Sequence, residues 1–127
     1  MFIADLMKHI HLDSVVTFVK LASYSGTQST GKVVEILGLC YDITDRTVVI
    51  VEDVVDSGST IVKLKEDLLK KNPKQILVCT LLFKPDAYMQ QEPIDYACFS
   101  IPNDFVVGYG LDYNHLGRQL KDLYVIE

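Results

Sequence analysis

Apolar and polar positions alternate along the chain in two kinds of run, and the order of the runs predicts an α/β fold. Continuous apolar runs at 47–53 and 75–83 are typical of strands that are covered on both faces of a parallel sheet. Between them, residues 59–72 place apolar side chains at helical spacing and leave lysines and acids for the solvent face. A strand, a helix and a second strand in this order predict a βαβ unit with two parallel strands.

Shorter runs predict the remaining elements. Residues 2–9 have the apolar spacing of the end of a helix, and glycines within 105–112 indicate an apolar segment that bends. Other apolar runs, rich in β-branched or aromatic residues, predict strands at 14–22, 32–39, 94–101 and 123–126. The first two of these strands flank a small, polar stretch at 23–31, so we expect a hairpin-like arm with a mobile loop. Residues 1–127 are expected to form a single α/β domain with a mostly parallel central sheet flanked by helices.

Composition restricts the class of protein. Apolar residues make up 49% of the 127 residues and charged residues 23%, which is ordinary for one globular domain. No apolar run approaches the ~20 residues of a membrane span, and the first residues do not resemble a signal peptide. Cys40, Cys79 and Cys98 lack the spacing of metal ligands, so we expect buried, reduced thiols in a cytoplasmic protein.

The overall charge argues against a surface that binds the nucleic-acid backbone. The formal net charge is −5 and the pI is about 5.1. A small phosphorylated ligand remains compatible with this charge, because backbone N–H groups and a divalent cation can hold a phosphate on an acidic protein.

The stretch VVIVEDVVDSGST, residues 48–60, carries the candidate chemistry, because it joins a predicted strand to a predicted helix. In parallel sheets, ligands bind beyond the carboxyl ends of the strands. The helix would begin at Ser57, Gly58, Ser59 and Thr60, where backbone N–H groups and hydroxyls form a candidate cradle for a phosphate. The alternative is a well-capped helix without a ligand. Neither a GxxxxGK[ST] loop nor a GxGxxG fingerprint is present, so triphosphate and dinucleotide ligands are not indicated.

Three acidic residues precede the candidate phosphate loop. Glu52 and Asp53 are adjacent on a strand, so their side chains point to opposite faces and need hydroxyl or metal partners. The hydroxyls of a sugar beside the phosphate would suit them. Asp56 stands next to the loop and is placed to accept or donate a proton. The alternative is a solvated acidic turn.

Three motifs resemble those of one family. VVIVEDVVDSGST closely resembles the phosphoribosyl-diphosphate motif of the type I phosphoribosyltransferases. FVKLASYSGTQSTG (18–31) resembles the mobile active-site loop of the hypoxanthine and hypoxanthine-guanine enzymes of that family. IPNDFVVGYGLDYNHLGRQL (101–120) resembles their C-terminal hood segment, which binds purine and pyrophosphate. The resemblance runs along essentially the whole chain.

The resemblance implies a purine-salvage reaction that moves a phosphoribosyl group from phosphoribosyl diphosphate to N9 of a 6-oxopurine. Glu52 and Asp53 match the acids that hold the ribose hydroxyls, partly through Mg²⁺, and Asp56 matches the general acid/base near the purine N7. The loop that holds the 5′-phosphate is matched by Ser57, Gly58, Ser59 and Thr60. Such enzymes are oligomers, so a homodimer or homotetramer is implied.

The hood segment and the mobile loop supply the remaining implied roles. Phe105 matches the aromatic residue that stacks on the purine, and Val106 matches a backbone contact to the base edge. Asp112 matches a second such contact and a ligand of a second Mg²⁺. The arginine that meets pyrophosphate is matched by Arg118. The loop pair that closes over the transition state is matched by Ser23 and Tyr24.

Two departures from the family pattern stand out. The lysine that reads the purine 6-oxo group is expected two residues before Asp95 and Tyr96, where this chain has Pro93. Lys84 lies upstream and does not match that position. The purine 6-oxo group would therefore be recognised by Lys84 or a water in place of the missing lysine, or the base would be recognised in a different way. The preference among hypoxanthine, guanine and xanthine therefore stays open.

The second departure concerns the start of the sequence. Relative to the family, we expect a preceding strand and a pyrophosphate-binding loop to be missing, which would expose an apolar sheet edge and lower stability or activity.

Alternative functions remain. A regulatory protein that binds phosphoribosyl diphosphate without catalysis, or an inactive fragment of the enzyme, would share the fold. A regulator is expected to lose catalytic residues or gain a basic surface, and Asp56, Asp112 and the net charge of −5 argue against this. An adenine-specific relative is not expected to carry FVVGYGLDY, and an orotate-specific one is expected to have lysines in the loop at 23–31.

Overall fold

A parallel three-stranded sheet forms the centre of the molecule. The computed structural model describes residues 1–23, 33–35 and 38–126. Strands β3 (Thr47–Val55), β4 (Gln75–Phe83) and β5 (Tyr96–Ser100) lie in the order β3-β4-β5 and are parallel throughout. Helix α2 (Ser59–Leu69) connects the first two strands. The predicted βαβ unit is thus confirmed, with β3 two residues longer and α2 three residues shorter than expected.

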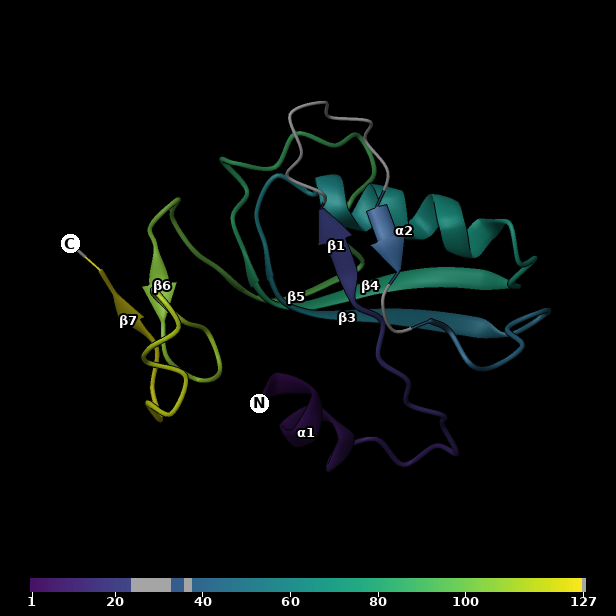
Figure 1. Ribbon diagram of the computed structural model, residues 1–127, viewed down its shortest axis with the longest axis horizontal. Coiled ribbons are helices and arrows are strands. Elements are labelled where there is room, and N and C mark those ends of the chain that lie inside the picture. Colours follow the sequence, from purple (N-terminus) through teal and green to yellow (C-terminus); the bar gives the residue numbers. More distant parts are fainter. Residues whose placement is uncertain (24–32, 36–37, 127) are drawn as a thin grey trace.

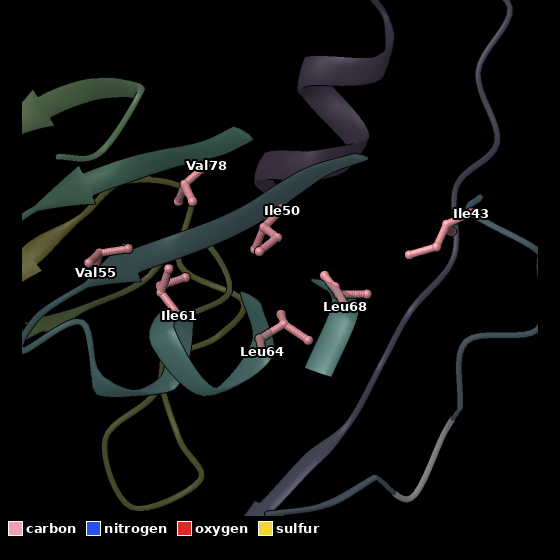
Figure 2. Packing of buried hydrophobic residues seen from close by; sticks show 7 residues of the cluster. All are labelled: Ile43, Ile50, Val55, Ile61, Leu64, Leu68 and Val78. Atoms are coloured by element: carbon pink, nitrogen blue, oxygen red, sulfur yellow. The ribbon is translucent and has the colours of Figure 1, made fainter. Parts of the chain in front are cut away.

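The core lies between α2 and the sheet. Figure 2 shows Ile61, Leu64 and Leu68 of α2 facing apolar side chains of β3 and β4. Their partners in the buried cluster are Ile43, Ile50, Val55 and Val78. Because Ile61, Leu64 and Leu68 lie on one face of α2, packing this face against the sheet fixes how the helix lies on it. The core therefore determines the geometry of the β3–α2 junction.

The N-terminal part contains helix α1 (Phe2–Met7) and two very short strands. β1 (Leu21–Ser23) and β2 (Val33–Glu35) pair antiparallel in a separate sheet. Figure 1 shows α1 and α2 on opposite sides of the central sheet. The predicted helix at 2–9 is confirmed in its position.

The predicted strand at 14–22 is largely wrong, because residues 13–20 have no regular structure. Val15 and Phe18 are exposed there. A strand requires a hydrogen-bonded partner as well as apolar composition, and here pairing begins only at Leu21, opposite Glu35. The predicted loop at 23–31 lies outside the described residues beyond Ser23.

The C-terminal part forms a second small sheet. β6 (Val106–Val107) pairs antiparallel with β7 (Tyr124–Val125), and the chain between them makes tight turns at Gly108–Leu111 and Tyr113–Leu116. Tyr109 has a φ of 51°, which is uncommon outside glycine. Figure 1 shows this ribbon on the side of the central sheet where β3 and β4 end. The bend expected within 105–112 is therefore confirmed.

Cysteine burial differs from expectation. All three cysteines are free, but Cys40 and Cys98 are exposed and only Cys79 is partly buried, so the prediction of three buried thiols is wrong.

Every residue of β5 is exposed, because β5 is an edge strand and α2 covers the other part of the sheet. Within the described ranges, every helix is too short or too polar to cross a membrane.

Candidate active site

The predicted phosphate loop forms the junction between β3 and α2. Gly58 precedes the helix with a φ of 78°, and Val62 N donates the first helical hydrogen bond to Gly58 O at 3.1 Å. The amides ahead of Val62 therefore lie in the positive end of the helix dipole. Ser57 Oγ and Ser59 Oγ lie 3.2 Å apart, and Ser59 and Thr60 are exposed. Amides and hydroxyls are thus gathered at one helix start, as a phosphate cradle requires.

A buried lysine meets Asp56 at the edge of this loop. Lys84 directly follows β4, as Asp56 directly follows β3, and Lys84 N donates to Val55 O at 3.0 Å. The Lys84 Nζ lies 3.2 Å from Asp56 Oδ2. The lysine side chain is 9% exposed and the aspartate side chain 54%. The ammonium group therefore has a charged partner, while the carboxylate still faces solvent and an incoming ligand.

The placement of Lys84 bears on the alternatives for base recognition that the sequence left open. Pro93, which stands where the base-reading lysine was expected, is exposed. Lys84, one of the alternatives that the sequence left open, lies in direct contact with the candidate acid/base. The signal for it was present in the sequence: parallel strands end at one edge of a sheet, and Lys84 is the first polar residue after the second strand.

Glu52 has an unusual protonation equilibrium. Burial, and to a smaller extent repulsion from Asp53, raise its pKa from 4.5 to about 7. Asp53 is exposed, and its Oδ1 accepts a hydrogen bond from Val54 N at 2.9 Å. The two adjacent acids thus differ in solvation, as expected for side chains on opposite faces of a strand.

The raised pKa of Glu52 predicts a pH-dependent stability. The folded chain binds a proton at Glu52 more tightly than the unfolded chain does. The contribution of this proton to the free energy of unfolding is therefore complete below pH 4.5 and is lost as the pH rises through about 7. We expect Glu52→Gln, which cannot ionise, to be more stable than the wild type at pH 8 by about 3 kcal/mol, with the difference shrinking towards pH 4.5. Urea unfolding of both proteins at several pH values measures this difference.

Glu66→Gln is the matched control for this experiment, because Glu66 lies exposed on α2 and its carboxylate stays in water. A stability difference for Glu52→Gln that does not change with pH would contradict the prediction.

The hood segment brings Asp112 and Arg118 together. Arg118 Nη2 lies 2.5 Å from Asp112 Oδ1, and Arg118 Nη1 donates to Gly110 O at 2.8 Å. The backbone N–H of His115 donates to Asp112 Oδ2 at 2.9 Å. Both oxygens of the carboxylate are therefore engaged, and the arginine is held beside it.

The predicted base-stacking residue lies at the start of the same segment. The Phe105 side chain is exposed, and its ring meets that of Tyr113 edge to face, with centroids 5.6 Å apart. Val106 follows it in β6. The Phe105 ring is thus exposed and in contact with one aromatic neighbour, which is compatible with stacking on a flat ligand.

A contact that sequence reasoning missed ties the hood segment to α1. The Tyr109 hydroxyl donates to Asp5 Oδ2 at 2.5 Å, across 104 positions of sequence. The pKa of Asp5 is lowered by its hydrogen bond with Lys8 and, next, by the one from Tyr109. No local pattern signals a pair this far apart, so only the fold could reveal it.

Two predicted catalytic residues cannot be placed in the site. The backbone of Ser23 lies in β1, and Tyr24 lies outside the described residues. The catalytic and binding roles of all the residues above stay predictions.

The donor set is compatible with Mg²⁺ only in combination with a substrate. Over the described ranges, no three His, Cys, Asp or Glu side chains gather as a metal site. Mg²⁺, however, is usually bound by one or two carboxylates together with waters and substrate phosphates. Glu52, Asp53 and Asp112 offer carboxylate oxygens of that kind.

The chain belongs to the phosphoribosyl transferase domain family, whose family model matches residues 1–114. It has the type I phosphoribosyltransferase fold, as the sequence predicted. The chain is similar to the hypoxanthine-guanine phosphoribosyltransferase of Mycobacterium tuberculosis, with 48% identity over 95% of this chain and 60% of the relative. The hypoxanthine phosphoribosyltransferase of Escherichia coli is 43% identical over 94% of this chain and 68% of the relative. The chain therefore spans 60% of the length of the mycobacterial relative.

Solved structures show the same likeness. A hypoxanthine-guanine phosphoribosyltransferase from Bacillus anthracis superimposes with a TM-score of 0.91 at 37% identity, over 99% of this chain and 75% of that one. A hypoxanthine phosphoribosyltransferase from Trypanosoma cruzi in complex with the product IMP gives 0.90 at 33% identity, over 99% and 68%.

Proposed function

We propose that the protein transfers the 5-phosphoribosyl group of phosphoribosyl diphosphate to N9 of hypoxanthine, and also of guanine, and releases pyrophosphate. The observation that carries this proposal is the pair of Asp56 and Lys84 beside the β3–α2 loop, 3.2 Å apart. A carboxylate that exchanges a proton and a cation that recognises a carbonyl oxygen suit a 6-oxopurine, which carries both N7 and O6. The similarity to hypoxanthine-guanine phosphoribosyltransferases supports the same substrates.

The sugar phosphate would bind along the end of β3. The loop that would hold its 5′-phosphate consists of Ser57, Gly58, Ser59 and Thr60, and Glu52 and Asp53 would face the ribose hydroxyls. Asp56 would then stand near N7 of the purine, Lys84 near O6, and the exposed Phe105 ring would stack on the base. These positions hold the two reactants in one orientation, which converts an encounter in solution into an intramolecular step.

Departure of pyrophosphate places negative charge on the leaving group and positive character on the ribose. Arg118 would stabilise the leaving group, and Asp112, Glu52 and Asp53 would hold Mg²⁺, which supplies positive charge to the diphosphate when bound. In the free protein Asp112 and Arg118 neutralise each other. On binding, the arginine would turn to the anion and the carboxylate to the cation. Ser23 and Tyr24 would cover the site and exclude water.

An absorbance assay with phosphoribosyl diphosphate, Mg²⁺ and each purine in turn tests the proposal. We expect turnover of hypoxanthine and no turnover of adenine. Turnover of adenine alone would refute the purine assignment. Binding of phosphoribosyl diphosphate without turnover of any purine would instead favour the regulatory alternative.

Two expectations about the protein's context accompany this function. An assembly of two or four copies is expected, and analytical ultracentrifugation measures it. A cytoplasmic location fits an enzyme that uses phosphoribosyl diphosphate and a chain whose cysteines are free.

A further inference from the structure

The segment after β4, residues 84–92, lies against the phosphate loop. The carbonyl oxygen of Ser57 accepts two hydrogen bonds from it, one from Gln90 Nε2 at 2.9 Å and one from Met89 N at 3.3 Å. Lys84 anchors the start of the segment through its backbone bond to Val55 and its side-chain contact with Asp56. The segment thus contacts the end of β3 and the start of the loop, at Val55, Asp56 and Ser57.

Packing shows how closely the segment approaches. A Cβ atom added at Gly58 would lie 2.4 Å from Tyr88 Cε2 and 2.7 Å from Gln90 Cγ. Gly58 is therefore required both for its φ of 78° and for the space it leaves to these two side chains.

Tyr88 is itself held in place. Its hydroxyl donates to Glu92 O at 2.6 Å, and its ring packs edge to face on Phe83. Lys65 of α2 pairs with the Glu92 carboxylate, so the end of the segment is tied to the same helix that the loop begins. Contacts at Lys84 and at Glu92 therefore hold both ends of the segment, and they fix the position of Gln90 between them.

Peptide geometry links this contact to phosphate binding. In a trans peptide the C=O and the following N–H point in opposite directions, and the chain contains no cis peptide among the residues described. Because the Ser57 carbonyl points at Gln90 and Met89, the N–H of Gly58 points away from the segment, to the other side of the loop. A carbonyl that accepts two hydrogen bonds also polarises its peptide, which strengthens the N–H as a donor.

We propose that Gln90 is a positioning residue: it orients the Ser57–Gly58 peptide so that the Gly58 N–H donates to the 5′-phosphate of the ligand. The identity of that ligand rests on the proposed function. Gln90 itself touches no phosphate, because it contacts the opposite end of the peptide.

The variant Gln90→Met tests this, since methionine has similar length but no N–H donor. We expect affinity for IMP, measured by calorimetry, to fall about 10-fold, which is the usual net effect of one hydrogen bond on an equilibrium constant. Affinity for inosine, which lacks the phosphate, should not change. The KM for phosphoribosyl diphosphate should rise by a similar factor with kcat within 2-fold, because only phosphate binding is affected.

Gln91→Met is the matched control, because Gln91 is the exposed neighbour of Gln90. Thermal unfolding of each variant shows whether it folds, and Gln90→Ala replaces Gln90→Met if the latter does not. Unchanged IMP affinity, or an equal loss for inosine and IMP, overturns the inference.

Turnover of hypoxanthine by the wild type is measured separately. Turnover together with unchanged IMP affinity in Gln90→Met keeps the proposed function and overturns the inference. If IMP affinity falls in Gln90→Met but the wild type turns over no hypoxanthine, the inference stands and the proposed function is refuted.

Discussion

Replacement of Asp56 with asparagine is expected to lower kcat about 100-fold or more and to leave the affinity for phosphoribosyl diphosphate within about 3-fold. The reason lies in the environment of the carboxylate. It is 54% exposed at the end of β3, and Lys84 contacts one of its oxygens. Asparagine has the same shape and can still accept a hydrogen bond from Lys84, so the loop should keep its structure. What it loses is the ability to take up a proton from the purine.

Steady-state kinetics with both substrates varied, together with calorimetry for phosphoribosyl diphosphate, measure the two effects separately. Asp53→Asn provides a contrast, because its expected role with the ribose predicts a loss of sugar-phosphate affinity. Asp67→Asn, at an exposed position of α2 that pairs with Lys70, should behave as wild type. Equal losses of kcat and of affinity in Asp56→Asn would assign Asp56 to substrate binding instead of proton transfer.

The phosphate loop and its strand were predictable because their signal is local. The apolar run of β3, the Ser-Gly-Ser-Thr stretch and the apolar stripe of α2 lie within 25 consecutive residues, and the next apolar run along the chain, β4, supplies the partner of β3. The strand predicted at 14–22 failed for the opposite reason. Its composition was suitable, but strand formation depends on a partner elsewhere in the chain, and pairing is available only from Leu21.

The contacts that complete the site are not local. Asp56 meets Lys84 because β3 and β4 are in register, with Val55 opposite Phe83. The next residue of each strand then falls at the same edge. Composition cannot supply this register, so the sequence alone left Lys84, a water and a different mode of base recognition open as alternatives. Tyr109 with Asp5, and Gln90 with Ser57, likewise depend on the tertiary arrangement.

The register also explains why a lysine can be buried here. The Lys84 side chain is 9% exposed, which is costly for an ammonium group unless it is paired, and Asp56 supplies the pair from the adjacent strand end. An ion pair of this kind contributes little net stability, because desolvation offsets the attraction. Its presence at this position is therefore better explained by ligand recognition than by folding.

Replacement of Lys84 with methionine is the strongest test of that explanation. Methionine fills a similar volume and leaves Asp56 with access to water, so we expect the melting temperature to change by no more than about 3 °C. The KM for hypoxanthine should rise about 30-fold, because a charged hydrogen bond to O6 contributes roughly 2 kcal/mol. Affinity for phosphoribosyl diphosphate without purine should be unchanged. Enzyme kinetics and calorimetry measure these quantities.

Two controls separate the possible sources of base recognition. Lys63→Met removes an exposed lysine from α2 and should have no effect on hypoxanthine. Pro93→Ala changes the position where the base-reading lysine was first expected, and it should also leave the KM unchanged, since Pro93 is exposed and Lys84 contacts Asp56. A rise in KM for Pro93→Ala without one for Lys84→Met would move base recognition away from the strand end. If Lys84→Met instead loses stability and purine affinity together, the ion pair with Asp56 supports the fold of the site, and its proposed contact with O6 is wrong.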